Sequence, residues 1–83
     1  MTTSEWEAMG RMVKGKDPMV IRTKDGEVSL EYIRSGTMEY FYLNLPFGQA
    51  ALYESSPIPK QYRKHLRIMY NSWYSIEIDN LPF

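Results

Sequence analysis

Three consecutive runs of alternating residues, separated only by short turn sequences, constrain the fold of this chain more than any other feature. Asp25 and Gly26 divide the first run from the second, and Ser35 and Gly36 divide the second from the third. Dipeptides of this kind favour tight two-residue turns between antiparallel strands. The sequence therefore predicts a β-meander between residues 19 and 45.

Each turn also predicts a register. With Asp25 and Gly26 as the first loop, Ile21 lies opposite Leu30, and with Ser35 and Gly36 as the second loop, Leu30 lies opposite Phe41. Both turns place apolar partners on one face, and their agreement supports the meander. The predicted core face consists of Met19, Ile21, Val28, Leu30, Tyr32, Phe41 and Leu43.

The opposite face of the predicted sheet is a mixture of apolar, aromatic and charged groups. It carries Val20, Arg22, Ser29, Glu31, Ile33, Met38, Tyr40 and Tyr42. A helix that covered this face would turn it into a second core, since aromatic residues are favoured in strands whatever their function. If the face is open, its tyrosines are suited to anchor a protein partner or to stack on nucleic-acid bases.

Helices are predicted at both ends of the chain. Ser4 followed by Glu7 is typical of a capping box, so we expect a helix over residues 5–14. Its apolar stripe is Trp6, Met9 and Val13. Gly10 lies within the span of this stripe and weakens the helix.

A second helix is predicted from Pro57 or Pro59 to Trp73, because proline is tolerated in a first helical turn. Its apolar stripe consists of Tyr62, Leu66, Met69, Tyr70 and Trp73. Residues 49–55 are either a fourth strand or a loop, and residues 74–78 alternate as a short last strand would. The sequence thus predicts a single α+β domain over residues 1–83, with a three- to four-stranded antiparallel meander, an N-terminal helix and a C-terminal helix.

The composition narrows the class of protein. The 83 residues contain ten Lys and Arg against ten Asp and Glu, so the formal net charge is zero and bulk attraction to nucleic acid is not expected. A chain without cysteine has no disulfide framework, no thiolate zinc site and no cysteine nucleophile. No stretch approaches the roughly 20 apolar residues of a membrane span, and no signal peptide is recognisable. We therefore expect a soluble cytoplasmic protein that does not act on membranes.

Residues for catalysis, metal binding or cofactor binding are sparse. His65 is the one histidine, and beside Tyr62 and Met69 a helical histidine is more often a packed, hydrogen-bonded residue than a catalyst. The five glycines match neither the dinucleotide fingerprint nor the P-loop, and the carboxylates match no calcium loop. We expect no cofactor, no metal and no enzymatic activity.

Four basic residues lie along the second predicted helix: Lys60, Arg63, Lys64 and Arg67. We call them the basic helix face. Most such runs are solvated surface, but this one also suits contact with phosphate or with an acidic patch on a partner.

These patterns together favour a small non-enzymatic protein-binding module. We expect an inhibitor or adaptor that occludes a larger protein or nucleoprotein machine, of the kind carried by phages and mobile elements. A single-stranded nucleic-acid-binding domain is the alternative, a small nuclease ranks behind it, and a homodimer remains open. The candidate partner-binding residues are Met38, Tyr40, Tyr42, Lys60, Arg63, Lys64 and Arg67.

Overall fold

The chain folds as an N-terminal helix, a four-stranded sheet and a C-terminal helix, which confirms the α+β class. The computed structural model describes residues 1–74 and 82–83. Its elements are α1 (Thr3–Val13), β1 (Met19–Thr23), β2 (Gly26–Ser35), β3 (Met38–Leu45), β4 (Gly48–Leu52) and α2 (Lys60–Tyr74). The strands are antiparallel and lie in the order β1-β2-β3-β4, so the sheet is a simple meander.

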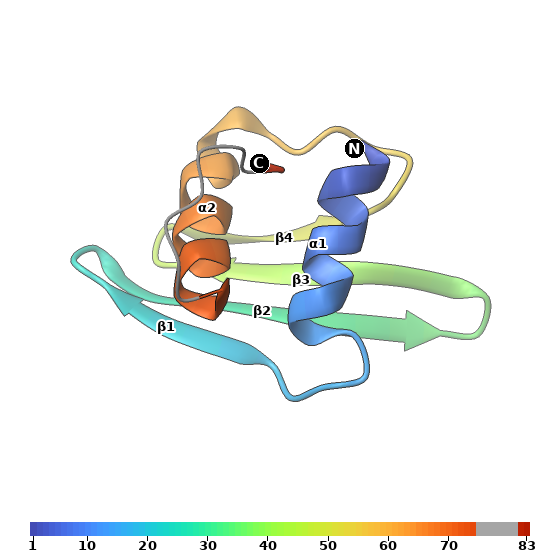
Figure 1. Cartoon of the computed structure of the whole chain (residues 1–83), viewed down its shortest axis with the longest axis horizontal. Helices are drawn as coiled ribbons and strands as arrows, with labels where there is room; N and C mark the ends of the chain where they lie inside the picture. Colours follow the sequence, from blue (N-terminus) through green and yellow to red (C-terminus); the bar gives the residue numbers. More distant parts are fainter. Residues whose placement is uncertain (75–81) are drawn as a thin grey trace.

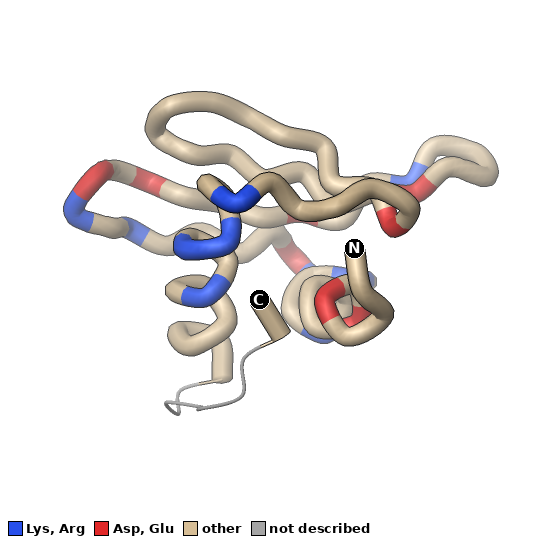
Figure 2. Tube along the Cα trace, turned by 90° about the horizontal axis from the view of Figure 1, so that it is seen from above, with Lys and Arg blue, Asp and Glu red and all other residues tan. Residues whose placement is uncertain are grey.

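Both helices lie on the same face of this sheet (Figures 1 and 2). The molecule therefore has two layers, with its core between the sheet and the helices. The predicted core face is confirmed: four of its members are fully buried, and Met19, Ile21 and Tyr32 pack partly buried at its margin. The fully buried members are Val28, Leu30, Phe41 and Leu43.

The predicted registers were wrong by two residues in both hairpins. Leu30 lies opposite Met19 and Leu43, where Ile21 and Phe41 were expected. Because side chains alternate with a period of two, a shift of two residues keeps every side chain on its predicted face. The core was therefore predicted correctly from turns that were placed incorrectly.

The first turn is built from Lys24 and Asp25, and Gly26 is already the first residue of β2. The Thr23 hydroxyl accepts from the Asp25 N–H at 3.2 Å and donates to the Gly26 carbonyl at 2.9 Å. Gly26 has φ 131°, and a Cβ there would lie 3.0 Å from Cγ of Pro46. The glycine is thus required beside a distant proline, which the local sequence does not indicate.

The second turn is built from Gly36 and Thr37, one residue later than predicted. Gly36 has φ 64°, a left-handed conformation that glycine adopts at no steric cost. The pairing then places Tyr32 opposite Phe41, with ring centroids 5.6 Å apart. This aromatic pair lies on the helix side of the sheet and extends its apolar surface.

The first helix begins earlier than predicted because its capping box uses other residues. Thr2 is the N-cap: its hydroxyl accepts from the Glu5 N–H at 3.1 Å, and the Glu5 carboxylate accepts from the Thr2 N–H at 2.6 Å. The prediction from Ser4 and Glu7 was wrong. The motif is the same, but it lies two residues earlier and its carboxylate faces the protein interior.

The remaining predictions concern β4, α2 and the C-terminal end. The fourth strand exists, over Gly48–Leu52. The predicted start of the second helix was wrong, because α2 begins at Lys60 and both prolines precede it. Leu66, Met69 and Tyr70 are buried as predicted. Tyr74 is the last residue of α2, and the rest of the predicted strand over 74–78 lies outside the described residues.

Candidate functional site

The sheet face that points away from α1 and α2 is the first candidate surface. We call it the open face, because no described helix covers it (Figure 2). Its side chains come from Val20, Arg22, Glu27, Ser29, Glu31, Ile33, Met38, Tyr40, Tyr42, Asn44, Gln49, Ala51 and Tyr53. Met38 and Val20 are each 55% exposed, so two aliphatic side chains project into solvent here.

The tyrosines of the open face are held by cross-strand neighbours. The rings of Tyr40 and Tyr53 lie 5.2 Å apart between centroids. The Tyr42 hydroxyl donates to the Gln49 side-chain oxygen. Because these contacts already restrict the rings, contact with another molecule would cost little further side-chain entropy.

The open face also carries charge, and that charge is not basic overall. Arg22 lies opposite Glu27, with 3.9 Å between the guanidinium and the carboxylate. Glu31 lies opposite Tyr42, is only partly exposed, and forms no ion pair within the described part of the chain. The local charge nearest the tyrosines is therefore negative.

The basic helix face is the second candidate surface, and two of its four residues have partners inside the protein. Arg63 pairs with Glu5 through Nη1, which ties α2 to the cap of α1. The Nε atom of Arg67 donates to the Phe83 carbonyl oxygen at 2.6 Å. Lys60, Lys64 and Arg67 are exposed and form no ion pair among residues 1–74 and 82–83, and of these three only Arg67 has a hydrogen-bond partner there.

The contact with Arg63 stabilises the charged form of the buried Glu5 carboxyl. Burial of this carboxyl acts to raise its pKa. The Thr2 backbone N–H and the Arg63 guanidinium both act to lower the pKa, and together they leave it below its ordinary value. The Glu5 side chain is 3% exposed and that of Arg63 is 31% exposed, so the carboxylate depends on the arginine more than the reverse.

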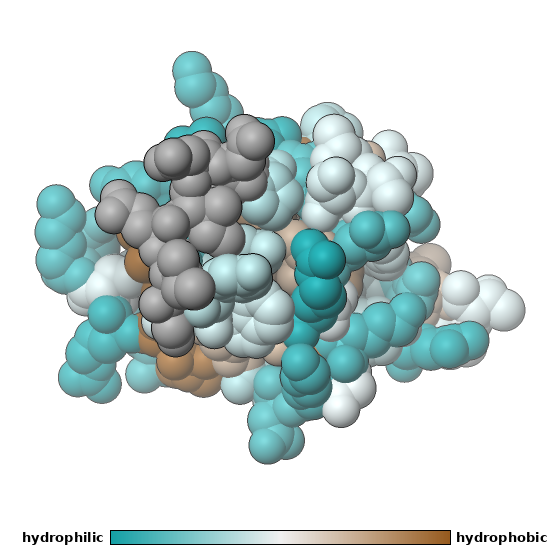
Figure 3. All heavy atoms as spheres, viewed as in Figure 1, coloured by the Kyte–Doolittle hydropathy of each residue, from teal (hydrophilic) through white to brown (hydrophobic). Residues whose placement is uncertain are grey.

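The two groups of predicted residues do not form one site. Met38, Tyr40 and Tyr42 lie on the open face, whereas the basic residues lie on α2 behind the other face (Figure 2). Hydrophilic residues predominate on the helix side that Figure 3 shows. A ligand that needs both aromatic rings and cations therefore cannot contact both groups on one flat surface.

His65 is 6% exposed and lies in the core, as predicted, but its Nδ1 atom has no hydrogen-bond partner among the described residues. The ring of Phe47, from the turn between β3 and β4, meets it edge to face at 5.6 Å and stacks on Tyr62 at 6.3 Å. Phe47 is 61% exposed. No periodic pattern in the sequence marks Phe47, although Pro46 before it and Gly48 after it indicate a turn tip.

A third group of polar side chains lies at the edge of α1. The Tyr32 hydroxyl donates to the Glu39 carboxylate, which raises the tyrosine pKa and lowers that of Glu39. The Lys14 ammonium lies 3.7 Å from the same carboxylate and 5.3 Å from the centre of the Tyr32 ring. These contacts connect the end of α1 to the hairpin of β2 and β3.

The described residues contain neither a metal-binding cluster nor a membrane-spanning helix. No group of three or more His, Cys, Asp or Glu among them is placed to hold a metal ion. Among the same residues, no helix has the length and apolar character needed to cross a membrane. The chain matches no protein-family model, no curated protein and no solved structure.

Proposed function

We propose that this protein is a non-enzymatic protein-binding module whose open face contacts the partner. The observation that carries the proposal is the exposure of Met38 and Val20, at 55% each, on a rigid sheet beside partly buried tyrosines. Interfaces are enriched in Tyr and Met, and tyrosine offers large contact area with few rotatable bonds. A rigid sheet that presents such residues is suited to bind a preformed protein surface.

Charge indicates what kind of partner fits. Glu31 lies beside Tyr42, and Glu54 is exposed just after Tyr53. A partner with an apolar centre and a basic rim would complement this arrangement. Single-stranded nucleic acid fits less well, because its phosphates would meet these carboxylates while Lys60 and Lys64 lie behind the other face.

The biological role is part of the same proposal. Occlusion of a larger protein or nucleoprotein machine in the cytoplasm suits a chain of 83 residues with one exposed binding face. A phage or mobile-element origin would accord with that role. Self-association through the open face is the competing outcome, since two copies would bury the same exposed side chains.

The proposal is tested by capture from a nuclease-treated lysate with three immobilised baits. These are the wild-type chain, the double variant Met38→Ser with Tyr40→Ser, and the control Ile68→Ser. Ile68 is a suitable control because it is an exposed aliphatic residue, at 39%, on α2. We expect the wild type and the control to enrich the same proteins, identified by quantitative mass spectrometry, and the double variant to lose them.

Three results would contradict the proposal. The double variant could retain the same proteins as the wild type. Alternatively, all three baits could capture only nucleic acid, in a strongly salt-dependent manner, when nuclease is omitted. Light scattering that showed a stable homodimer lost only in the double variant would assign the open face to self-association.

A further inference from the structure

Gly10 lies in the middle of α1 although nothing in the fold requires a glycine there. Glycine destabilises a helix interior relative to alanine. Gly10 is not among the glycines with positive φ. A Cβ at this position would lie 4.0 Å from Cβ of Lys14 and 4.0 Å from Cζ of Phe41, which is ordinary van der Waals contact. The missing side chain therefore leaves space that the protein does not need for its own packing.

That space forms a hollow of about 450 Å³ on the surface of α1. We call it the Gly10 hollow, and it is lined by Trp6, Glu7, Gly10, Arg11, Lys14 and Phe41. Trp6, Glu7 and Lys14 surround Gly10 because neighbours on a helix surface lie three or four positions apart, and Arg11 is the next residue along the chain. The volume lies within the range of small-molecule sites, which is roughly 300 to 1,000 Å³.

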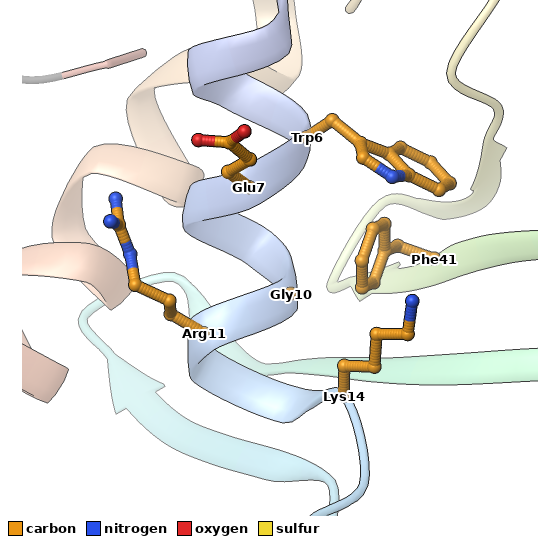
Figure 4. A pocket seen from close by; sticks show the side chains of 6 residues that line it. All are labelled: Trp6, Glu7, Gly10, Arg11, Lys14 and Phe41. Atoms are coloured by element: carbon orange, nitrogen blue, oxygen red, sulfur yellow. The ribbon is translucent and has the colours of Figure 1, made fainter.

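The aromatic wall of the hollow consists of Trp6 and Phe41. Their rings meet edge to face, with centroids 4.7 Å apart, and Figure 4 shows them together on one side of the helix. Trp6 is partly exposed, whereas Phe41 is fully buried. A flat apolar group placed over Gly10 would contact the tryptophan ring and the edge of the core.

The charged side chains of the hollow are Glu7, Arg11 and Lys14, and Figure 4 shows Gly10 between the two aromatic rings on one side and Glu7 and Arg11 on the other. Arg11 and Lys14 supply two cations against one carboxylate, that of Glu7. Lys14 already contacts Glu39, but Arg11 forms no ion pair within the described part of the chain. The planar guanidinium of arginine binds carboxylates through two parallel hydrogen bonds.

We propose that the Gly10 hollow binds a small aromatic carboxylate. The ring of the ligand lies over Gly10 against Trp6, and its carboxylate pairs with Arg11 while Lys14 adds positive charge. This site is separate from the open face, because α1 lies on the other side of the sheet. The proposal does not depend on the protein-binding function.

The test uses 3-phenylpropionate as the probe and its neutral amide as the matched comparison. The chain has two tryptophans, so its NMR spectrum has two indole N–H signals, and the variant Trp73→Phe identifies the signal of Trp6. We expect 3-phenylpropionate to shift the Trp6 signal to saturation, with a dissociation constant on the order of 1 mM. The amide should bind at least about fivefold more weakly.

Variants of the lining locate the site. Gly10→Gln should weaken binding at least about tenfold because its side chain fills the hollow, and it should raise the unfolding temperature by about 2–6 °C. Arg11→Gln should weaken binding about fivefold. Arg22→Gln is the matched control, since Arg22 lies on the open face, and it should bind as the wild type does.

The proposal fails if the Trp6 signal does not shift to saturation at about 20 mM probe. It also fails if Gly10→Gln, shown by circular dichroism to be folded, binds as tightly as the wild type. Equal affinity for the acid and the amide, or an unchanged affinity in Arg11→Gln, would overturn the assignment of an anionic ligand.

Discussion

The two faces of the sheet have the same strands and the same alternation, yet they differ in what holds their side chains. On the helix side, Phe41 and Leu43 are fully buried beneath α1 and α2. On the open face, Tyr40 and Tyr42 contact mainly their neighbours across the strands. Adjacent residues of β3 therefore differ in their surroundings: Phe41 and Leu43 are fully buried, whereas Tyr40 and Tyr42 remain partly exposed.

This difference leaves one face of the sheet partly exposed in a small domain. Small chains bury a limited fraction of their surface and have little stability to spare. Here the buried apolar residues of both helices pack into one core against a single face of the sheet. Among the described residues, the core cluster and the residues packed against it contain no residue of the open face.

The largest expected effect separates two adjacent residues of β3. Phe41→Ala should lower the free energy of unfolding by about 3–5 kcal/mol, because it leaves a cavity between the sheet and α1. Tyr40→Ala should lower it by about 1 kcal/mol, since it removes one partly exposed ring contact. Urea unfolding followed by circular dichroism measures both. Equal losses would show that the open face is as important to stability as the covered one.

The ion pair between Glu5 and Arg63 gives a smaller effect with a predicted asymmetry. Arg63→Met should lower the free energy of unfolding by about 2–3 kcal/mol, because it leaves the buried Glu5 carboxylate with only the cap hydrogen bonds. Glu5→Gln should lower it by about 1 kcal/mol, since Arg63 is 31% exposed and can turn to solvent. The same unfolding measurement applies, and the reverse order would contradict the described burial.

The ion pair between Glu5 and Arg63 should also make the stability of the protein depend on pH in the acid range. The pKa of Glu5 is lowered in the folded protein, so its contribution to stability is present above the ordinary value of 4.5. That contribution is lost as the pH falls through the lowered folded value. Between about pH 5 and about pH 2.5, the unfolding free energy of the wild type should fall more steeply with falling pH than that of Glu5→Gln. The difference between the two slopes should correspond to at most one bound proton. Parallel curves of unfolding free energy against pH would exclude Glu5 as the source.

The smallest effects on stability are expected for the exposed residues of the open face. Met38→Ser and Val20→Thr should each change the free energy of unfolding by no more than about 0.5 kcal/mol. Both residues are 55% exposed, so little buried area is lost. Partner affinity should fall in the same variants. A large loss of stability in thermal unfolding would indicate that this face is covered in solution.

The fold was predictable from the sequence to the extent that it depends on alternation. The faces of β2 and β3 were correct because Leu30 and Phe41 keep their side of the sheet under a shift of two residues. The exact turn positions were not: Gly26 is the first residue of β2 and not part of the turn, and it lies so close to Pro46, twenty residues away along the chain, that a Cβ there would be 3.0 Å from the proline Cγ. No local pattern contains that contact.

The candidate site was predictable in part for the same reason. Tyr40 and Tyr42 follow from alternation, and the structure places both on one face. The partner of Arg63 is Glu5, 58 residues earlier, and only the packing of α2 beside α1 brings them together. A basic stripe on a helix therefore did not indicate which of its cations are used inside the protein.

The claim that the open face is the binding surface is tested most directly by methionine oxidation with dilute peroxide. In the free protein, Met38 should be oxidised well before the buried Met9, Met12 and Met69. In complex with the captured partner, oxidation of Met38 should slow at least about tenfold, as mass spectrometry of the peptides would show. Oxidation of Met38 at the same rate in the free and bound protein would contradict the account.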